Sequence, residues 1–121
     1  MTFDLELESS PAAPARARSA LEQLAARLSK ERMRDVRLLV SELVTNAVRH
    51  ADGEAVRLVV GLNGGTLRVE VHDPGCGFEV REAPTDPLRA SGWGLVLVDE
   101  LSDRWGVDHS PRTRVWFEMD D

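Results

Sequence analysis

The first residues alternate between apolar and acidic side chains, which predicts a strand with one buried face. From residue 2 to residue 8, phenylalanine or leucine occupies every second position after Thr2, and aspartate or glutamate stands between them. A period of two is typical of a half-buried strand. Ser10 and Pro11 follow as a helix cap and a proline in the first turn. We expect this helix to end near Ser29.

The hydrophobic period then lengthens to that of a helix. Between residues 30 and 51, apolar side chains recur every three or four positions. This pattern predicts an amphipathic helix that lays one face on the core. The residues of that face are Val36, Leu39, Val40, Leu43, Val44 and Ala47. Asp52 and Gly53 come next, and a glycine just past the last periodic residue typically ends a helix.

Alternation returns in the second half of the chain. Residues 56–62 and 66–72 flank the turn Asn63-Gly64-Gly65, which predicts a hairpin with one buried and one wetter face. Residues 74–91 contain three prolines and little periodicity, so we expect a long loop. Loops of this length in a compact domain are usually lids or binding loops.

A short helix and a second hairpin complete the pattern. Residues 93–101 predict the helix, and residues 105–109 and 113–119 predict strands around a turn at 110–112. The sum is a single α+β domain over residues 1–121. It has two layers, an α/β sandwich with helices packed on one face of a mixed, mostly antiparallel sheet.

Composition narrows the class of protein. The 121 residues carry a net charge of -6, which argues against direct binding to nucleic acid. Cys76 is the single cysteine, so no internal disulfide forms and a reducing cytoplasm is the simplest location. No apolar run reaches the length of a membrane span, and the first residues do not resemble a signal peptide. We therefore expect a cytoplasmic protein without a membrane partner.

Three polar residues in the second helix form one stripe. Glu42, Asn46 and His50 are four residues apart, and this spacing aligns side chains along one side of a helix. The Asn46 amide oxygen suits Mg²⁺, a hard cation that prefers oxygen ligands. Glu42 could accept a proton from a hydroxyl or water that attacks a γ-phosphate. The alternative is an ordinary exposed helix edge, and we interpret His50 as a structural residue.

A carboxylate followed by glycines marks the end of the third predicted strand. Asp73 can accept a hydrogen bond from an exocyclic amine, the group that distinguishes adenine from guanine. Gly75 and Gly77 give the turn conformational freedom and leave room for a flat base. Cys76 between them is interpreted as a small buried side chain rather than a nucleophile. The alternative is a plain Asp-Pro-Gly turn.

A glycine-rich helix start provides a candidate phosphate site. Gly92 and Gly94 flank Trp93 where the last helix is predicted to begin, and free backbone N–H groups there attract anions. A P-loop is excluded because Lys30 has no glycine near it. Arg89 is the best-placed cation, although a solvated loop charge is the equal alternative.

In this order and spacing, the three segments resemble the GHKL ATPase superfamily, whose Bergerat fold is shared by gyrase, histidine kinases and heat-shock chaperones. Residues 42–51 resemble its N box, residues 73–77 its first glycine box and residues 91–95 its second. Thr113 matches a threonine that helps to hold adenine. The short chain and the glutamate four residues before the asparagine are most similar to the anti-sigma-factor serine kinases.

The resemblance implies roles for these residues. Asn46 would coordinate Mg²⁺, Glu42 would be the general base, and Asp73 would bind the adenine amine of ATP or ADP. The remaining candidates for nucleotide contacts are Gly75, Gly77, Arg89, Gly92, Gly94 and Thr113. In such kinases the phosphate acceptor is a serine of an anti-anti-sigma factor, the competing partner is a sigma factor, and the kinase is often a homodimer.

Two functional hypotheses follow from these motifs. The first is an ATP-dependent serine/threonine kinase that acts on a regulatory protein. The second is a non-catalytic ATP-binding module that sequesters a partner without phosphorylating it. A histidine kinase is a poor alternative, because the chain has no room for a dimerising phosphoacceptor helix pair. A structural domain without a ligand would require all three motifs to be accidental.

Overall fold

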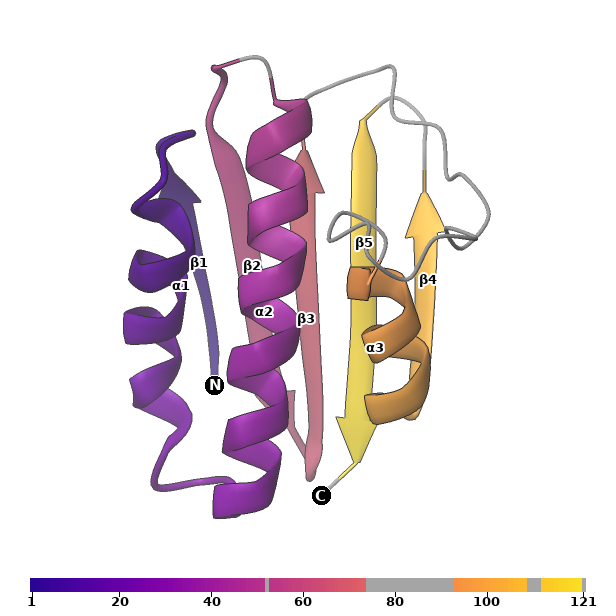
Figure 1. Ribbon diagram of the computed structural model, residues 1–121. Coiled ribbons are helices and arrows are strands. Elements are labelled where there is room, and N and C mark those ends of the chain that lie inside the picture. The colour runs from indigo at the N-terminus through magenta and orange to yellow at the C-terminus, as the bar shows by residue number, and fades with distance from the viewer. Residues whose placement is uncertain (52, 74–92, 109–111, 121) are drawn as a thin grey trace.

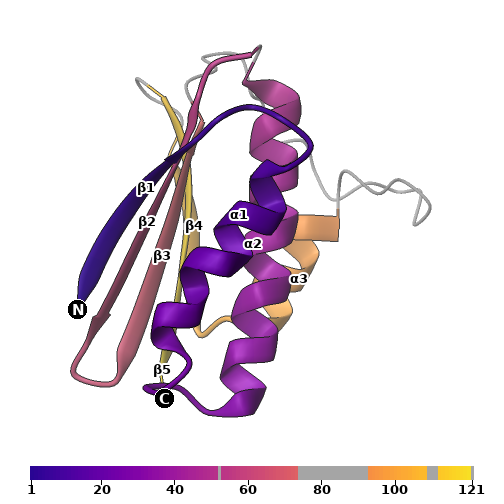
Figure 2. The same ribbon diagram turned by 90° about the vertical axis from the view of Figure 1, so that its left-hand side faces the viewer.

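The computed structural model describes residues 1–51, 53–73, 93–108 and 112–120, with the backbone alone for residues 93–95. Within this part of the chain, a five-stranded sheet and three α-helices form two layers (Figure 1). Figure 2 shows that all three helices cover the same face of the sheet. The expected α+β, two-layer architecture is confirmed.

The sheet brings strands together that are distant in sequence. Its order is β1-β2-β3-β5-β4, and every pairing among these strands is antiparallel. The strands are β1 (Thr2–Leu7), β2 (Val56–Asn63), β3 (Thr66–Asp73), β4 (Arg104–Asp108) and β5 (Thr113–Asp120). The helices are α1 (Ala13–Leu21), the 3₁₀ helix η1 (Glu22–Leu24), α2 (Lys30–His50) and α3 (Trp93–Leu101). Thus β5 returns between β3 and β4.

Helix α2 spans the middle of the helical layer, as its hydrophobic period predicted. Ser29 caps its start, because its hydroxyl oxygen accepts a hydrogen bond from the Arg32 backbone N–H at 3.1 Å. Basic Arg49 and His50 occupy the last turn, where the helix dipole favours positive charge. All six predicted core residues of this helix are buried, and Met33 joins them.

Helix α1 begins later than predicted. Its first residue is Ala13, and Pro14, not Pro11, lies in its first turn. The predicted Ser10 cap is wrong, because Ala12 is the N-cap residue and makes no side-chain cap. The Ser10 hydroxyl instead accepts a hydrogen bond from the Ala12 backbone N–H at 3.3 Å, in the turn just before the helix.

Helix α1 also ends earlier than the predicted Ser29. It stops at Leu21 and continues as η1. Its buried residues are four apart, from Ala13 through Ala17 to Leu21, whereas Leu24 follows after only three. The tighter turn of a 3₁₀ helix keeps Leu24 on the buried side. The apolar pattern continues through the change of helix type, which is why the predicted length was wrong.

The hairpin of β2 and β3 has the predicted turn and sets the face on which each β3 residue lies. Gly64 and Gly65 have φ values of 58° and 84°, as a two-residue hairpin turn requires. Every second residue of β3 from Leu67 onward is buried, which puts Asp73 on the helix-covered face. Arg68 and the residues in phase with it therefore lie on the open face.

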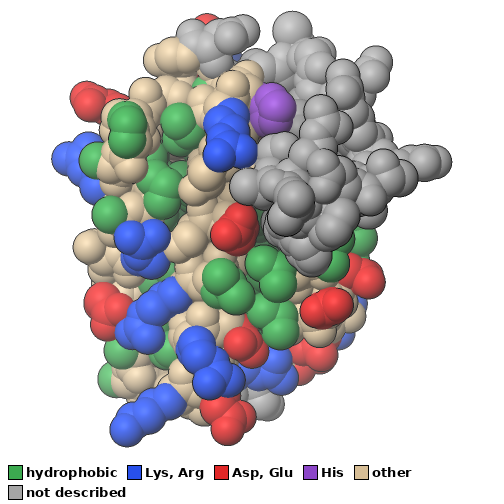
Figure 3. Space-filling view, viewed as in Figure 1, with side chains coloured by type: hydrophobic (Ala, Val, Ile, Leu, Met, Phe, Trp, Pro, Cys, Tyr) green, Lys and Arg blue, Asp and Glu red, His purple; other side chains and the backbone are tan. Residues whose placement is uncertain are grey.

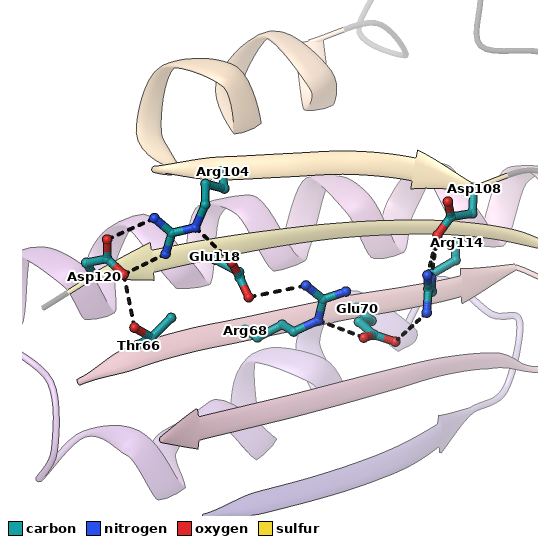
Figure 4. Close-up of polar contacts among 8 residues, drawn as sticks. All are labelled: Thr66, Arg68, Glu70, Arg104, Asp108, Arg114, Glu118 and Asp120. Carbon is teal, nitrogen blue, oxygen red and sulfur yellow. Dashed lines mark hydrogen bonds and ion pairs between the residues drawn. The ribbon is translucent and has the colours of Figure 1, made fainter. Parts of the chain in front are cut away.

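The open face carries a network of ion pairs (Figure 4). Glu70 accepts a hydrogen bond from Arg68 at 2.9 Å and lies 3.6 Å from the Arg114 guanidinium. The Glu118 carboxylate lies 3.2 Å from the Arg68 guanidinium and 2.8 Å from the Arg104 guanidinium, so it connects these two arginines. The network links β3, β5 and β4, and its outer members are Thr66, Asp108 and Asp120.

Candidate functional site

The C-terminal half of α2 and the adjoining ends of β3 and β5 line a small, partly open cavity of about 30 Å³. Its walls are formed by Leu43, Asn46, Ala47, His50, Val71, Asp73, Thr113 and Val115. The antiparallel pairing of β3 with β5 and the packing of α2 on β3 bring these residues together. Three predicted site residues, Asn46, Asp73 and Thr113, therefore share one cavity.

Asp73 and Thr113 are direct cross-strand partners at the shared end of β3 and β5. Partners of this kind lie on the same face of a sheet, here the face covered by α2. Only 4% of Asp73 and 3% of Thr113 are exposed. A buried carboxylate is stable only when it is hydrogen-bonded, and no fully buried side-chain nitrogen or oxygen of the described residues lacks a partner. Both side chains already have interaction partners within the structure, and the carboxylate oxygens of Asp73 are acceptors for an N–H donor.

The polar stripe of α2 reaches the cavity with two of its three residues. Asn46 is half-buried and His50 is exposed at the helix end, and both line the cavity. Glu42 is half-buried one helical turn before Asn46 and is not part of the cavity wall. Glu42 thus lies closer to the N-terminus of α2 than Asn46 does.

Sequence reasoning did not identify the apolar walls of the cavity. Val71 precedes Asp73 by two residues and Val115 follows Thr113 by two. The period of two along a strand puts each valine on the same face as its polar neighbour. This signal was present in the sequence. Leu43 and Ala47 belong to the predicted core face of α2, so the cavity lies where that face meets the polar stripe.

The side chains around the cavity offer acceptors for an amine-bearing ring and an amide oxygen for a hard cation, while its volume of about 30 Å³ is well below the roughly 300–1,000 Å³ of a typical ligand pocket. Apolar walls with a few polar groups, here one buried carboxylate and one hydroxyl, are typical of small-molecule sites. Among the described residues, no group of three or more His, Cys, Asp or Glu could hold a metal ion by itself. A cation beside the Asn46 amide would thus need oxygens from a bound ligand and from water, the coordination that Mg²⁺ commonly adopts.

Several predicted site residues fall outside this geometry. Gly75, Gly77, Arg89 and Gly92 lie outside the described residues. Gly94 is the second residue of α3, whose start at Trp93 agrees with the predicted helix start. The predicted nucleotide contacts of these residues stay predictions.

The comparison with known families assigns the chain to one of them. Residues 7–119 match the model of the histidine kinase-like ATPase domain. The chain therefore belongs to the histidine kinase-like ATPase domain family, which confirms the resemblance to GHKL ATPases and implies the use of a nucleotide. No helix in the described part of the chain is long and apolar enough to cross a membrane.

Individual relatives within this family are similar over most of the chain. The chain is 31% identical over 90 residues to the serine-protein kinase RsbW of Oceanobacillus iheyensis. The aligned region covers 62% of this chain and 57% of that protein. It is 31% identical over 123 residues to the anti-sigma F factor of Pasteuria penetrans, covering 90% of this chain and 82% of that protein. The chain thus spans little more than half the length of the first relative. The predicted similarity to anti-sigma-factor serine kinases is confirmed.

Solved structures confirm the fold. The RsbU and RsbW domains of a Mycobacterium tuberculosis protein match 99% of this chain with a TM-score of 0.77 at 21% identity, over 32% of that chain. A blue-light activated histidine kinase from Erythrobacter litoralis matches 90% of this chain with a TM-score of 0.64 at 27% identity, over 44% of that chain. Both matches are parts of longer chains.

Proposed function

We propose that this protein binds ATP with Mg²⁺ and transfers the γ-phosphate to a serine of an antagonist protein, and that this controls a partner such as a sigma factor. The observation that carries the proposal is the cavity shared by Asn46, Asp73 and Thr113, with Glu42 one helical turn before Asn46. The names of the relatives, serine-protein kinase RsbW and anti-sigma F factor, support the same function.

The nucleotide would be held at both of its ends. Asp73 would accept a hydrogen bond from the adenine amine, with the Thr113 hydroxyl beside it and the valines of β3 and β5 against the ring. The glycines at positions 75 and 77 would leave room for the base. Phosphates would be bound by Arg89, Gly92 and the backbone at Gly94, where α3 begins.

Asn46 would hold Mg²⁺ through its amide oxygen. When bound, Mg²⁺ would supply positive charge beside the phosphates. Asn46 is half-buried in mid-helix, where asparagine is unfavourable. A ligand-binding role gives this side chain a reason to be there.

Glu42 would act as the general base for the acceptor serine. It would take the proton of the serine hydroxyl while that oxygen bonds to the γ-phosphorus and the bond to ADP breaks. Its place one turn before Asn46, among the residues that do not line the cavity, supports this role, because the acceptor must approach from outside the nucleotide pocket. The antagonist would be of the anti-anti-sigma type, the protein would act in the cytoplasm, and a homodimer is part of the proposal.

Calorimetric titration of the protein with ATP, ADP and GTP, each with and without Mg²⁺, tests nucleotide binding. We expect binding of ATP and ADP, tighter ATP binding with Mg²⁺, and no binding of GTP. Equal binding of GTP and ATP would overturn the assignment of Asp73 as the adenine reader.

Transfer of labelled γ-phosphate to a co-purified protein tests the kinase reaction separately. We expect phosphoserine on that partner. If ATP binds but no transfer occurs, the protein is instead the non-catalytic module that sequesters its partner, and the assignment of Glu42 is wrong.

A further inference from the structure

An apolar patch lies on the outer surface of the helical layer, where α2 and α3 pack together. Leu38 of α2 is 41% exposed, one of three exposed large hydrophobic residues in the described part of the chain. Leu97 and Leu101 of α3 are half-buried at the edge of the core. In Figure 3, hydrophobic side chains gather over these two helices. We call Leu38, Leu97 and Leu101 the α2–α3 patch.

Acidic side chains border this patch on several sides, and Arg34, one turn before Leu38 on α2, borders it as well. Asp35 precedes Leu38 by about one turn and Glu42 follows it by one turn, so both flank it on the same helix. Glu100 is exposed on α3. Figure 3 shows acidic side chains above, below and to the right of the hydrophobic group. Apolar surface with an acidic border fits a partner of the opposite pattern.

Only part of the charge of this border is paired within the described structure. Asp35 is 3.9 Å from the guanidinium of Arg34, a side chain that is 77% exposed. Neither Glu42 nor Glu100 forms an ion pair within 4 Å with another described residue. The border therefore keeps negative charge that a basic partner can bind.

The open face of the sheet differs in this respect. Its carboxylates are already paired, since Glu70 and Glu118 each contact two arginines. A basic partner would have to break those pairs and would gain little net charge interaction. Of the two faces, the one formed by α2 and α3 joins exposed apolar surface to unbalanced negative charge.

We propose that the α2–α3 patch is the docking site for the phosphate acceptor, through a protein segment that carries aliphatic side chains between arginines or lysines. This inference rests on the proposed function, in which Glu42 receives the proton of the acceptor hydroxyl. A base must lie within hydrogen-bond reach of that hydroxyl, so the acceptor has to cover the turn of α2 that carries Glu42. Leu38, four residues earlier, is the exposed apolar side chain next to that turn.

Binding of labelled peptides to the full chain, followed by fluorescence anisotropy, tests this docking site. The first probe has two leucines and a serine between arginines, and the second has glutamates in place of the arginines. We expect the first peptide to bind and the second to bind at least ten-fold more weakly. Equal binding of both, or no binding of either, would overturn the proposal.

Leu38→Glu separates docking from simple charge attraction. Because the change adds negative charge, a basic peptide held by charge alone would bind the variant more tightly. Docking on the α2–α3 patch predicts the opposite: Leu38→Glu should lower the affinity for the basic peptide at least ten-fold. The affinity of Leu38→Met for this peptide should stay within two-fold of that of the parent. Unchanged or tighter binding to Leu38→Glu would refute the docking site. Leu38 is exposed, so we expect unchanged folding by circular dichroism.

Charge reversal at the border gives an independent result. Glu100→Lys should lower the affinity for the basic peptide about ten-fold. Glu54 is an exposed glutamate just before β2, and Glu54→Lys should leave this affinity within two-fold of that of the parent. Similar losses in both variants would mean that only net charge matters and would overturn the proposal.

ADP titration of the same proteins keeps the two proposals apart, because docking variants should bind ADP as the parent does. Failure of the parent to bind ADP would refute the proposed function instead.

Discussion

Asp73 is the residue whose chemistry most directly limits what the cavity can bind. It is a carboxylate at 4% exposure, opposite a buried threonine and between apolar walls. In such surroundings a hydrogen bond to a charged acceptor is stronger than in water, and an unmatched polar ligand is costly. Discrimination between bases should therefore depend on this one side chain.

Asp73→Asn keeps the shape of the side chain but removes its charge and turns one acceptor into a donor. We expect ADP affinity to fall by about 1.5–3 kcal/mol, the contribution of a hydrogen bond to a charged group, or roughly 10- to 150-fold in Kd. Calorimetric titration measures this. Asp4→Asn is the matched control, since Asp4 is exposed on β1 and pairs only with Arg57 among described residues. Undiminished binding by Asp73→Asn would remove the adenine assignment.

Glu42 allows a different separation, between binding and transfer. It does not line the cavity and lies one turn before Asn46, so Glu42→Ala should leave the Kd for ATP within two-fold of the parent. Loss of a general base should slow phosphate transfer about 10²- to 10⁴-fold. Single-turnover transfer to the acceptor measures the rate, and Glu31→Ala in the first turn of the same helix is the control. Transfer at the parental rate would show that Glu42 is not the base.

At the scale of single elements, β4 depends on a glycine. A Cβ atom added at Gly106 would lie 2.7 Å from the indole nitrogen of Trp116, its cross-strand partner on β5. The Arg68 guanidinium carbon also lies over the Trp116 ring, 4.4 Å from the ring centroid. The ring therefore has little freedom to move away from β4.

Gly106→Ala should destabilise the protein by about 1–3 kcal/mol, the usual cost of overpacking. Urea unfolding measures the change. Gly61→Ala on β2 is the control, because its nearest non-neighbouring atom would be 3.6 Å away, an ordinary contact. In a Trp116→Leu background the Gly106→Ala change should cost little, and an equal cost in both backgrounds would contradict the role of the indole ring.

Elements with a strong local pattern were predictable, and those that depend on distant partners were not. The bounds of α2 and the β2–β3 turn followed from periodicity and from Gly64-Gly65. The end of α1 at Leu21 was missed, because a 3₁₀ continuation preserves the apolar pattern. The insertion of β5 between β3 and β4 is a long-range choice that no local period encodes. The juxtaposition of Asp73 with Thr113 depends on that choice, so only the family resemblance predicted it.

At the scale of the whole molecule, the ion-pair network connects three strands across the open face, and its effect on stability depends on pH. Burial raises the pKa of Glu70, but hydrogen bonds from Arg68 and His72 outweigh this and leave its pKa below the usual value. The Arg104 guanidinium lowers the pKa of Glu118, and hydrogen bonds from Arg104 and Thr66 lower that of Asp120. These carboxylates bind protons more tightly in the unfolded chain than in the folded one.

Stability from these groups is therefore complete above their unfolded pKa values, near 4.5 for glutamate and 3.8 for aspartate, and is lost as the pH falls through the lower folded values. We expect the contribution of these carboxylates to the free energy of unfolding to change little from pH 7 to 5 and to decrease below about pH 4.5. Urea unfolding at several pH values measures this, and Glu70→Gln should make the decrease shallower. Because the pairs are partly exposed, added salt should reduce their contribution. An identical pH profile for the parent and Glu70→Gln would mean that the ion pairs of Glu70 do not contribute to the pH dependence of stability.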